Sequence, residues 1–524
     1  MIRLPASPTG NRILESGREN GAYSENPLPN AAENRLSDPI VRTLDAEIPV
    51  CPIGEALSEC RCVKQVLGEQ VEIPLSVAAS LHHRLGALER RGNFLLCRDR
   101  LLAVRRKDTP VYVLAFDIGT TTVVSYLLDG KTGRQLSVSS ILNPQTSYGG
   151  DVISRSEYAV SHEDGKLTSL IRSALCSLTE ENSKKAGITP EDICFASIVG
   201  NTCMQHLYLG VSPKSLLCAP YTATVDELQL LSAASLGLPI HPAAQAAVFP
   251  SIAGFVGGDA VSVLLSLPES SFQDLTLILD IGTNGELVLA KGDSRYTCST
   301  AAGPAFEGAR ICCGMRGSAG AFDHAFVEDG RLQFTTIDGL SPSGICGSGL
   351  IDLICCLLEL HILSPDGRIN PSSKWPEQTA ALYGHRLIKK EKITAFLLTD
   401  DPDGIYLTQK DIREVQLAKS AIAAGIASLC EAMGVFVEDI RSVLLAGAFG
   451  NYLSPKSACR IGLIPPVLLG RIQGIGNAAG EGAKLAALSR GALEAAERLA
   501  KNTKFLELAT LPGFQDAYLS HLNF

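Results

Sequence analysis

The sequence predicts an α/β protein in which one strand–turn–strand unit occurs twice, giving two similar lobes behind a small N-terminal α+β unit. The first observation is the string Asp-Ile-Gly-Thr, which begins at Asp117 and again at Asp280. The second is that apolar runs flank both copies, as expected for paired buried strands. The third is an alternation of such runs with helical segments from Tyr112 onward, which is typical of α/β folds.

The composition indicates a large globular chain. It has 524 residues, 46% of them apolar and 19% charged, which allows several domains with sizeable cores. No run reaches the length of a membrane span and no secretory signal stands out, so we expect a cytoplasmic protein without a membrane partner. The net charge of −9 and the absence of basic blocks argue against nucleic acid as a partner. The oligomeric state is open, and a homodimer is among the assemblies that the sequence allows.

The N-terminal part divides into a tail and a small unit. Residues 1–45 are rich in Asn, Ser, Pro and Glu, which predicts a disordered tail. Residues 46–110 are expected to form the small unit, with a helix within 71–91 and a strand–turn–strand over 94–106. Its size is near the lower limit for an independent core, so we expect it to pack on the next part of the chain.

The first lobe is predicted to span residues 111–274. Strands over Val111–Phe116 and Val123–Leu128 flank the first Asp-Ile-Gly-Thr. A buried strand over Ile193–Val199 and a glycine turn that leads into a helix over Gly254–Leu267 come next along the chain.

The second lobe is predicted over residues 275–524. Its strand pair spans Leu275–Leu279 and Glu286–Ala290. After this pair we expect a glycine turn and helix over Gly344–Leu360, a long helix over Asp411–Gly434, and a strand with a glycine turn over Ser442–Leu453.

The two turns have the chemistry of a phosphate site. Backbone N–H groups and hydroxyls in a tight glycine turn suit phosphate oxygens. The preceding Asp117 would repel phosphate unless Mg²⁺ lay between them, and Mg²⁺ favours one or two carboxylates plus water. Asp280 would hold a second metal water or the attacking water. The alternative is that both aspartates merely cap turns. The predicted phosphate residues are Gly119, Thr120, Thr121 and Thr122 in the first turn, and Gly282, Thr283 and Asn284 in the second.

Other phosphate motifs are absent from the sequence. A Walker A loop would need glycine at Ser125, and no Rossmann Gly-x-Gly-x-x-Gly follows the first strand. "GICGSG" at 344–349 is a weaker relative that could place backbone N–H groups at a helix N-terminus.

Longer strings resemble a known family. The order of the two Asp-Ile-Gly-Thr turns and a later Ala-Gly-Ala-Phe-Gly resembles the superfamily of acetate and sugar kinases, heat-shock chaperones and actin, which implies an actin-like (ribonuclease H-like) fold. Over about residues 112–485 the chain is similar to the reductive activators of corrinoid proteins. The strings that carry this resemblance are "FDIGTTT", "NPQTSYGGDVISR", "GNTCMQHLYLG", "LDIGTNGE", "CSTAAGPAFEGARICCGMRG", "GICGSGLID", "DIREVQLAKSAI", "LLAGAFGNYL" and "GNAAGEGA".

The resemblance implies an ATPase, with ATP and Mg²⁺, that reduces an inactive Co(II) corrinoid on a methyl-transfer protein to Co(I). In that family the electron comes through an N-terminal [2Fe–2S] ferredoxin domain. Here the early cysteines Cys51, Cys60, Cys62 and Cys97 lack the ferredoxin spacing. We therefore expect a separate ferredoxin-like donor, and an iron–sulfur cluster on these cysteines is the less favoured alternative.

The resemblance also implies roles for individual residues. Asp117, Asp280 and Asn201 would be catalytic, with Asn201 orienting a water or, as the alternative, capping a turn. The adenosine side would be lined by Gly447, Ala448, Phe449 and Gly450. His206 is interpreted as a helix-surface histidine or a group of the cleft, and Glu307 and Arg316 as charged candidates at the cleft or the partner surface.

Two other functions stay open at this point. A chaperone-like module, switched by nucleotide to bind a metalloprotein, would need no electron transfer. A small-molecule kinase would need a substrate signature that the sequence does not show.

Overall fold

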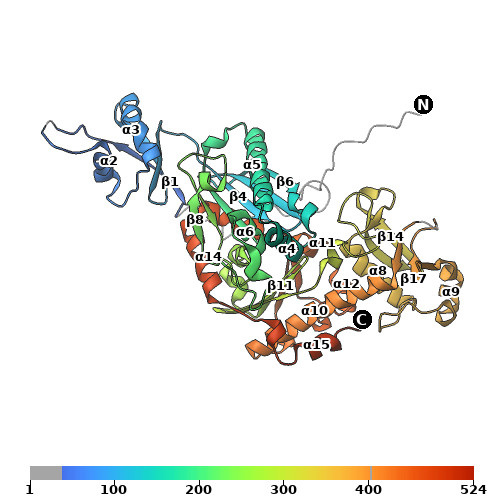
Figure 1. Cartoon of the computed structure of the whole chain (residues 1–524). Helices are drawn as coiled ribbons and strands as arrows, with labels where there is room; N and C mark the ends of the chain where they lie inside the picture. Colours follow the sequence, from blue (N-terminus) through green and yellow to red (C-terminus); the bar gives the residue numbers. More distant parts are fainter. Residues whose placement is uncertain (1–37, 53, 402–403) are drawn as a thin grey trace, which may run out of the picture.

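The computed structural model describes residues 38–52, 54–401 and 404–524, a two-lobed body with a smaller unit at each end (Figure 1). Residues 1–37 of the predicted disordered tail lie outside the described residues. Strand β1 (Val41–Glu47) begins within the rest of that segment and pairs antiparallel with β2, so residues 41–45 belong to the N-terminal unit. In the described ranges, no helix is long and apolar enough to cross a membrane.

The N-terminal unit is a three-stranded antiparallel sheet with two helices: β1, β2 (Arg91–Cys97), β3 (Arg100–Arg105), α2 (Glu59–Leu67) and α3 (Leu75–Ala87). As expected from its size, it has no separate core. Phe94 and Leu101 belong to one apolar cluster with Val113 of the first lobe and Leu488 near the C-terminus. The unit projects from the body in Figure 1, yet its base is continuous with that body.

The first lobe is built on a six-stranded sheet of order β6-β5-β4-β7-β9-β8. Its strands are β4 (Tyr112–Ile118), β5 (Thr122–Asp129), β6 (Gln135–Leu142), β7 (Ile193–Gly200), β8 (Gln229–Ser232) and β9 (Gln245–Val248). Its helices are α4 (Val152–His162), α5 (Lys166–Ala186), α6 (Thr202–Leu209) and α7 (Gly258–Ser266).

The second lobe has the order β20-β19-β10-β11-β12-β21, in which five strands repeat the arrangement of the first lobe; the sixth, β21, lies beside β12, whereas β8 of the first lobe lies beside β9. In both sheets the Asp-Ile-Gly-Thr strand pairs antiparallel with the next strand and parallel with a later one, which confirms the predicted duplication. Its strands are β10 (Thr276–Ile281), β11 (Gly285–Lys291), β12 (Ser294–Thr300), β19 (Ser442–Ala446), β20 (Ile472–Gly474) and β21 (Thr503–Phe505). Its helices are α10 (Gln409–Met433), α11 (Gly447–Tyr452), α12 (Pro455–Arg460), α13 (Ala478–Leu488), α14 (Arg490–Asn502) and α15 (Phe514–Ser520).

A large insertion between β12 and α10 forms the other end unit of Figure 1. It contains two small sheets, β14-β13-β15 and β16-β17-β18, of which the sequence analysis predicted neither. Its elements are β13 (Ala321–Glu328), β14 (Arg331–Thr336), β15 (Gly344–Ile345), β16 (Leu387–Lys390), β17 (Ile393–Leu397), β18 (Tyr406–Thr408), α8 (Gly347–Glu359) and α9 (Glu377–Tyr383).

Side-chain alternation along β4 decides where its aspartate points. Leu114 and Phe116 share a core with Ile171 of α5, whereas Val113 and Ala115 share one with Ala483 of α13. Because successive strand residues face opposite sides, Asp117 lies on the face of Val113 and Ala115. It therefore points toward the α13 side of the sheet.

The same alternation applies to β10. Leu277 and Leu279 share a core with Ile422 of α10, whereas Ile278 packs with Val263 of α7 and Ala478 of α13. Asp280 is two residues after Ile278, so it lies on the same face of the strand and faces α7 and α13. Both aspartates thus point toward one helix pair, which contributes to the cores of both lobes.

The two helices of this pair approach each other closely. The Ser262 hydroxyl on α7 donates to the Ala479 carbonyl on α13 at 2.6 Å. A Cβ at Gly482 would lie 2.0 Å from the Ser262 carbonyl oxygen, so only glycine permits this spacing. The contact fixes how the N-termini of α7 and α13 lie beside the strand ends.

Candidate active site

Each Asp-Ile-Gly-Thr turn is closed by its own backbone. The Gly119 N–H donates to the Thr122 carbonyl at 3.0 Å, and the Gly282 N–H donates to the Asn284 carbonyl at 2.9 Å. A Cβ at Gly119 would lie 2.7 Å from the Thr122 oxygen, which explains the glycine. Both turns keep their hydroxyl side chains at the strand ends that carry the aspartates.

The aspartates are half-buried groups at the ends of buried strands. Burial raises the pKa of Asp117 to about 6, opposed by a hydrogen bond from Asn477 and reinforced by the charge of Asp280. Burial also raises the pKa of Asp280 to about 7, reinforced by Asp259 and Glu307. Each aspartate therefore lies within the electrostatic field of other carboxylates.

Asp259, Glu286 and Asn477 are among the residues of this site that the sequence analysis missed. Asp259 lies in the first turn of α7, and burial, with the charge of Asp117, raises its pKa to about 7. Glu286 is the cross-strand partner of Asp280, and burial with the charges of Asp259 and Asp280 raises its pKa well above its usual range.

Asn477 is the N-cap of α13. Its side-chain oxygen accepts from the Gly480 N–H at 3.1 Å, and its amide donates to the Tyr126 hydroxyl at 3.0 Å and to Asp117. Two sequence patterns could have revealed Asn477 and Asp259: the Gly-Asn that opens "GNAAGEGA", and the Gly-Gly-Asp at the start of the helix at 258. Both patterns are typical of helix starts near a ligand.

Glu307 connects the two turns. It ends the short 3₁₀ helix Pro304–Glu307 of the second lobe. The Thr121 hydroxyl of the first lobe donates to its Oε2 at 3.2 Å, and the Thr283 hydroxyl of the second donates to its Oε1 at 2.9 Å. The sequence analysis placed Glu307 only loosely at the cleft or a partner surface, and the structure places it on both turns.

Arg155 and Arg316 lie near this bridge. Arg155 is fully buried in α4, and its Nη2 has no hydrogen-bond partner among the described residues. Burial lowers the pKa of Arg155 to about 10; the charge of Glu307 opposes this shift and that of Arg316 reinforces it. Arg316, the other charged candidate, is exposed in the loop before β13.

Asn201 makes the capping contact that the sequence gave as its alternative role, and it makes a second contact to the first turn. Its oxygen caps α6 by accepting from the Met204 N–H at 3.0 Å, while its amide donates to the Thr120 hydroxyl at 3.0 Å. Asn143 similarly holds the first turn, donating to the Gly119 carbonyl at 2.9 Å. Capping therefore positions the Asn201 amide against the phosphate-type turn.

The interpretation of His206 as a surface or cleft histidine is wrong. It is buried, with 1% of its surface exposed, and Nδ1 lies 2.7 Å from the Thr202 carbonyl. The Thr224 N–H donates to Nε2 at 2.9 Å. Both ring nitrogens are engaged with backbone, and burial lowers the pKa of His206, so it is a neutral core residue.

The segment Gly447–Gly450 follows β19 and begins α11. Gly447 has φ +79°, and a Cβ there would lie 2.8 Å from Asp280 Oδ1, so this backbone lies directly against the second aspartate. Phe449 stacks on Phe306 with ring centroids 5.4 Å apart. Its ring is thus packed within the second lobe, beside the residue preceding Glu307. Ala448 is part of the same helix start.

The carboxylates fit a cation that keeps most of its water. Asp117, Asp259, Asp280 and Glu286 are all half-buried, and burial together with neighbouring carboxylates raises their pKa values. In the described part of the chain, no three His, Cys, Asp or Glu side chains converge as a ligand set for a metal ion. Mg²⁺, which binds through one or two carboxylates and several waters, suits such a donor set.

Two of the early cysteines lie together in the N-terminal unit: burial raises the pKa of Cys62, and the charge of Cys51 and a hydrogen bond with it reinforce the shift. Cys62 and Cys97 are buried, and Cys97 lies in the shared core, where burial raises its pKa. Cys51 and Cys60 are half-buried, and the Cys51 thiol contacts the Glu55 carbonyl at 3.2 Å.

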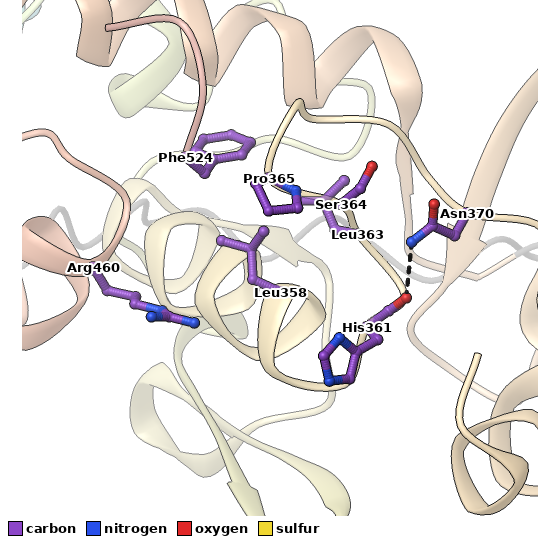
Figure 2. A pocket seen from close by; sticks show the side chains of 8 residues that line it. All are labelled: Leu358, His361, Leu363, Ser364, Pro365, Asn370, Arg460 and Phe524. Atoms are coloured by element: carbon purple, nitrogen blue, oxygen red, sulfur yellow. Dashed lines mark hydrogen bonds between the residues drawn. The ribbon is translucent and has the colours of Figure 1, made fainter. Parts of the chain in front are cut away.

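A cavity of about 300 Å³ lies elsewhere, between the end of α8 and the C-terminal segment (Figure 2). Leu358, Leu363, Pro365 and Phe524 form its apolar wall, and the Asn370 amide donates to the His361 carbonyl at 3.1 Å beside it. It shares no lining residue with the two turns.

Comparisons with known proteins agree with this arrangement. Residues 112–268 match the family model of the RACo middle region, and residues 274–524 match that of the C-terminal domain of RACo, the ASKHA domain. The chain is 37% identical over 423 residues to the corrinoid activation enzyme RamQ of Eubacterium limosum, covering 80% of this chain and 71% of that protein. It is 24% identical over 444 residues to the [Co(II) methylated amine-specific corrinoid protein] reductase of Methanosarcina barkeri, covering 79% and 77%.

A solved structure is similar over nearly the whole chain. The reductive activator for corrinoid,iron-sulfur protein superimposes with a TM-score of 0.80 at 30% identity, covering 93% of this chain and 79% of that one. Two family models match consecutive parts of the chain, and a relative is 37% identical over 80% of the chain. The chain therefore belongs to the family of reductive activators of corrinoid proteins.

Proposed function

We propose that this protein couples ATP hydrolysis to the reduction of a protein-bound corrinoid from Co(II) to Co(I). One electron enters from a separate low-potential, ferredoxin-like donor, which is oxidised as the cobalt is reduced. ATP and water give ADP and phosphate. The corrinoid partner is a methyl-transfer protein, in keeping with family membership and with the names of the relatives.

The observation that carries the proposal is that the aspartates of both turns lie beside the N-termini of α7 and α13: Asn477, the N-cap of α13, donates to Asp117, and Asp259 in the first turn of α7 lies near Asp117 and Asp280. Helix N-termini and turn N–H groups favour anions. We assign the phosphates to the turns Gly119–Thr122 and Gly282–Asn284, and the adenosine to Gly447–Gly450. Asn201, which holds the Thr120 hydroxyl at 3.0 Å, orients the first turn.

Asp117 and Asp280 are assigned as the residues that hold Mg²⁺ through its waters. When bound, the ion neutralises phosphate oxygens that these carboxylates would otherwise repel. Asn477 keeps Asp117 directed at the site by donating to it from the start of α13. Since Asn477 lies at the inter-lobe helix pair, phosphate binding and lobe position are linked.

Nucleotide binding can drive electron transfer only if the corrinoid partner has different affinities for the nucleotide-bound and nucleotide-free arrangements of the lobes. A conformational change affects the cobalt only if the corrinoid partner binds one arrangement of the lobes more tightly than another. We assign this change to the lobes moving about the α7–α13 contact, a hinge or shear motion. The partner surface would then lie on parts of both lobes.

The ATPase reaction tests this proposal. We expect slow ATP hydrolysis that a Co(II) corrinoid protein stimulates, and a loss of about 100-fold or more in Asp117→Asn and Asp280→Asn. Glu328→Gln, on the exposed end of β13, is the matched control and keeps full activity. Stimulation by the partner without any redox change would instead favour a chaperone-like module. Phosphoryl transfer to a metabolite would favour a kinase.

A further inference from the structure

We propose that Glu307 is a positioning residue that competes with nucleotide phosphate for the hydroxyls of the two Asp-Ile-Gly-Thr turns. The inference rests on the proposed nucleotide site and adds a control on its affinity. Glu307 belongs to the second lobe and accepts from Thr121 of the first lobe as well as from Thr283 of its own. It therefore joins the lobes at the place where phosphate is expected.

The competition follows from hydrogen-bond capacity. A threonine hydroxyl has one proton to donate. Thr121 donates to Oε2 at 3.2 Å, and Thr283 donates to Oε1 at 2.9 Å, so both protons are directed to this carboxylate. Neither hydroxyl can donate to a phosphate oxygen at the same time. A phosphate that uses them must release Glu307, which also breaks the link between lobes.

The position of the Glu307 carboxylate is fixed by the surrounding backbone. A Cβ at Gly282 would lie 3.3 Å from Glu307 Oε1, so the carboxylate rests on the glycine backbone of the second turn. Gly308, the next residue, has φ +78°, and its Cβ would lie 2.4 Å from the Met315 carbonyl oxygen. The backbone after Glu307 is thus held in a conformation and a spacing that favour glycine.

The surrounding charges also oppose a phosphate beside Glu307. Asp280 and Glu286 both lie in its field, and each has a raised pKa to which Glu307 contributes. Arg155 of the first lobe also lies near Glu307, and its Nη2 has no hydrogen-bond partner in the part of the chain that the structure describes. This buried cation attracts the Glu307 carboxylate toward the first lobe.

The test compares nucleotide affinity in Glu307→Gln, Glu307→Ala and the charge control Glu328→Gln, using calorimetry with Mg-ADP. Removing the competing anion is expected to lower the Kd of Mg-ADP about tenfold in both Glu307 variants and to leave it unchanged in the control. Without nucleotide, both Glu307 variants should melt at a lower temperature because the inter-lobe bridge is lost. Their melting temperatures should rise more than wild type on adding Mg-ADP.

The outcomes are distinguishable. Unchanged or weaker Mg-ADP binding in the Glu307 variants, with wild type binding normally, would overturn the competition even if their melting temperature falls. Unchanged binding with a large loss of kcat would make Glu307 a catalytic base instead. If wild type binds no Mg-ADP at all, the nucleotide site itself is wrong, and the inference falls with it.

Discussion

Asp280 and Glu286 lie directly opposite each other on strands β10 and β11, on the same face of the sheet. The corresponding neighbour of Asp117 in the first lobe is Val124. The duplicated units are therefore chemically unequal: the second has a pair of carboxylates where the first has one. Like charges opposite each other destabilise a sheet unless a proton or cation is shared between them.

Glu286→Gln should therefore stabilise the protein in the absence of Mg²⁺. We expect a gain on the order of 0.5–1 kcal/mol in the free energy of unfolding at pH 7.5, because one of two repelling carboxylates is removed. Urea unfolding in the presence of a chelator measures it. The gain should shrink when Mg²⁺ and ADP are added, and a less stable variant under chelation would contradict the account.

Gly447→Ala should weaken both stability and ATP hydrolysis. The residue has φ +79°, and the new Cβ would lie 2.8 Å from Asp280 Oδ1. Gly513→Ala is the matched control, since it has φ +84° but nothing within 4 Å of its Cβ. Both should lose about 1 kcal/mol of stability through backbone strain. Only Gly447→Ala should lose activity, and equal activity in the two variants would show that this backbone does not fix Asp280.

Gly482→Ala should separate α13 from α7. Its Cβ would lie 2.0 Å from the Ser262 carbonyl oxygen, so the helices must move apart at a cost of about 1–3 kcal/mol. At Gly491, in α14, the nearest atom would be 3.7 Å from the Cβ, and alanine there should be neutral or slightly stabilising. Thermal unfolding of both variants decides the point. A neutral Gly482→Ala would mean that the helix pair does not fix the lobes.

Lys419 predicts a pH dependence of stability. It is buried, its ammonium group donates to the Asn523 carbonyl, and burial lowers its pKa to about 8 from about 10.5. Between these values the unfolded chain binds more protons than the folded one, so stability rises with pH. Relative to Lys419→Met, wild type should gain up to about 3 kcal/mol from pH 8 to 10.5. Urea unfolding of both proteins across this range measures the difference, and parallel pH profiles would contradict the lowered pKa.

The sequence predicted the strands and turns that carry the two aspartates because their signal is local. A continuous apolar run ends at Asp117 and at Asp280, and a glycine turn follows each, so strand and turn are set together. The glycines at 119 and 447 belong to the same short-range pattern, and a Cβ there would lie 2.7 Å and 2.8 Å from its nearest neighbour.

The rest depends on contacts distant in sequence. Thr121 and Glu307 are 186 positions apart, and Tyr126 and Asn477 are 351 apart, so no local pattern joins them. His206 was misassigned for a similar reason. The loop that contains Thr224 packs over it and donates a backbone N–H to its ring, and the helix pattern in the sequence does not reveal that loop. The sheets of the insertion were missed because their strands are either very short, as β15 and β18 are, or only partly buried, as β13, β14 and β16 are.

The most direct test of the central claim is the oxidation state of cobalt. A Co(II) corrinoid protein, a reduced low-potential ferredoxin and this protein are combined under anaerobic conditions, and the visible bands of the corrinoid are followed before and after ATP is added. The account predicts conversion to Co(I) that requires ATP and fails with Asp117→Asn. The account would be contradicted if Co(II) were converted to Co(I) equally well without ATP, or if ATP were hydrolysed and no Co(I) formed.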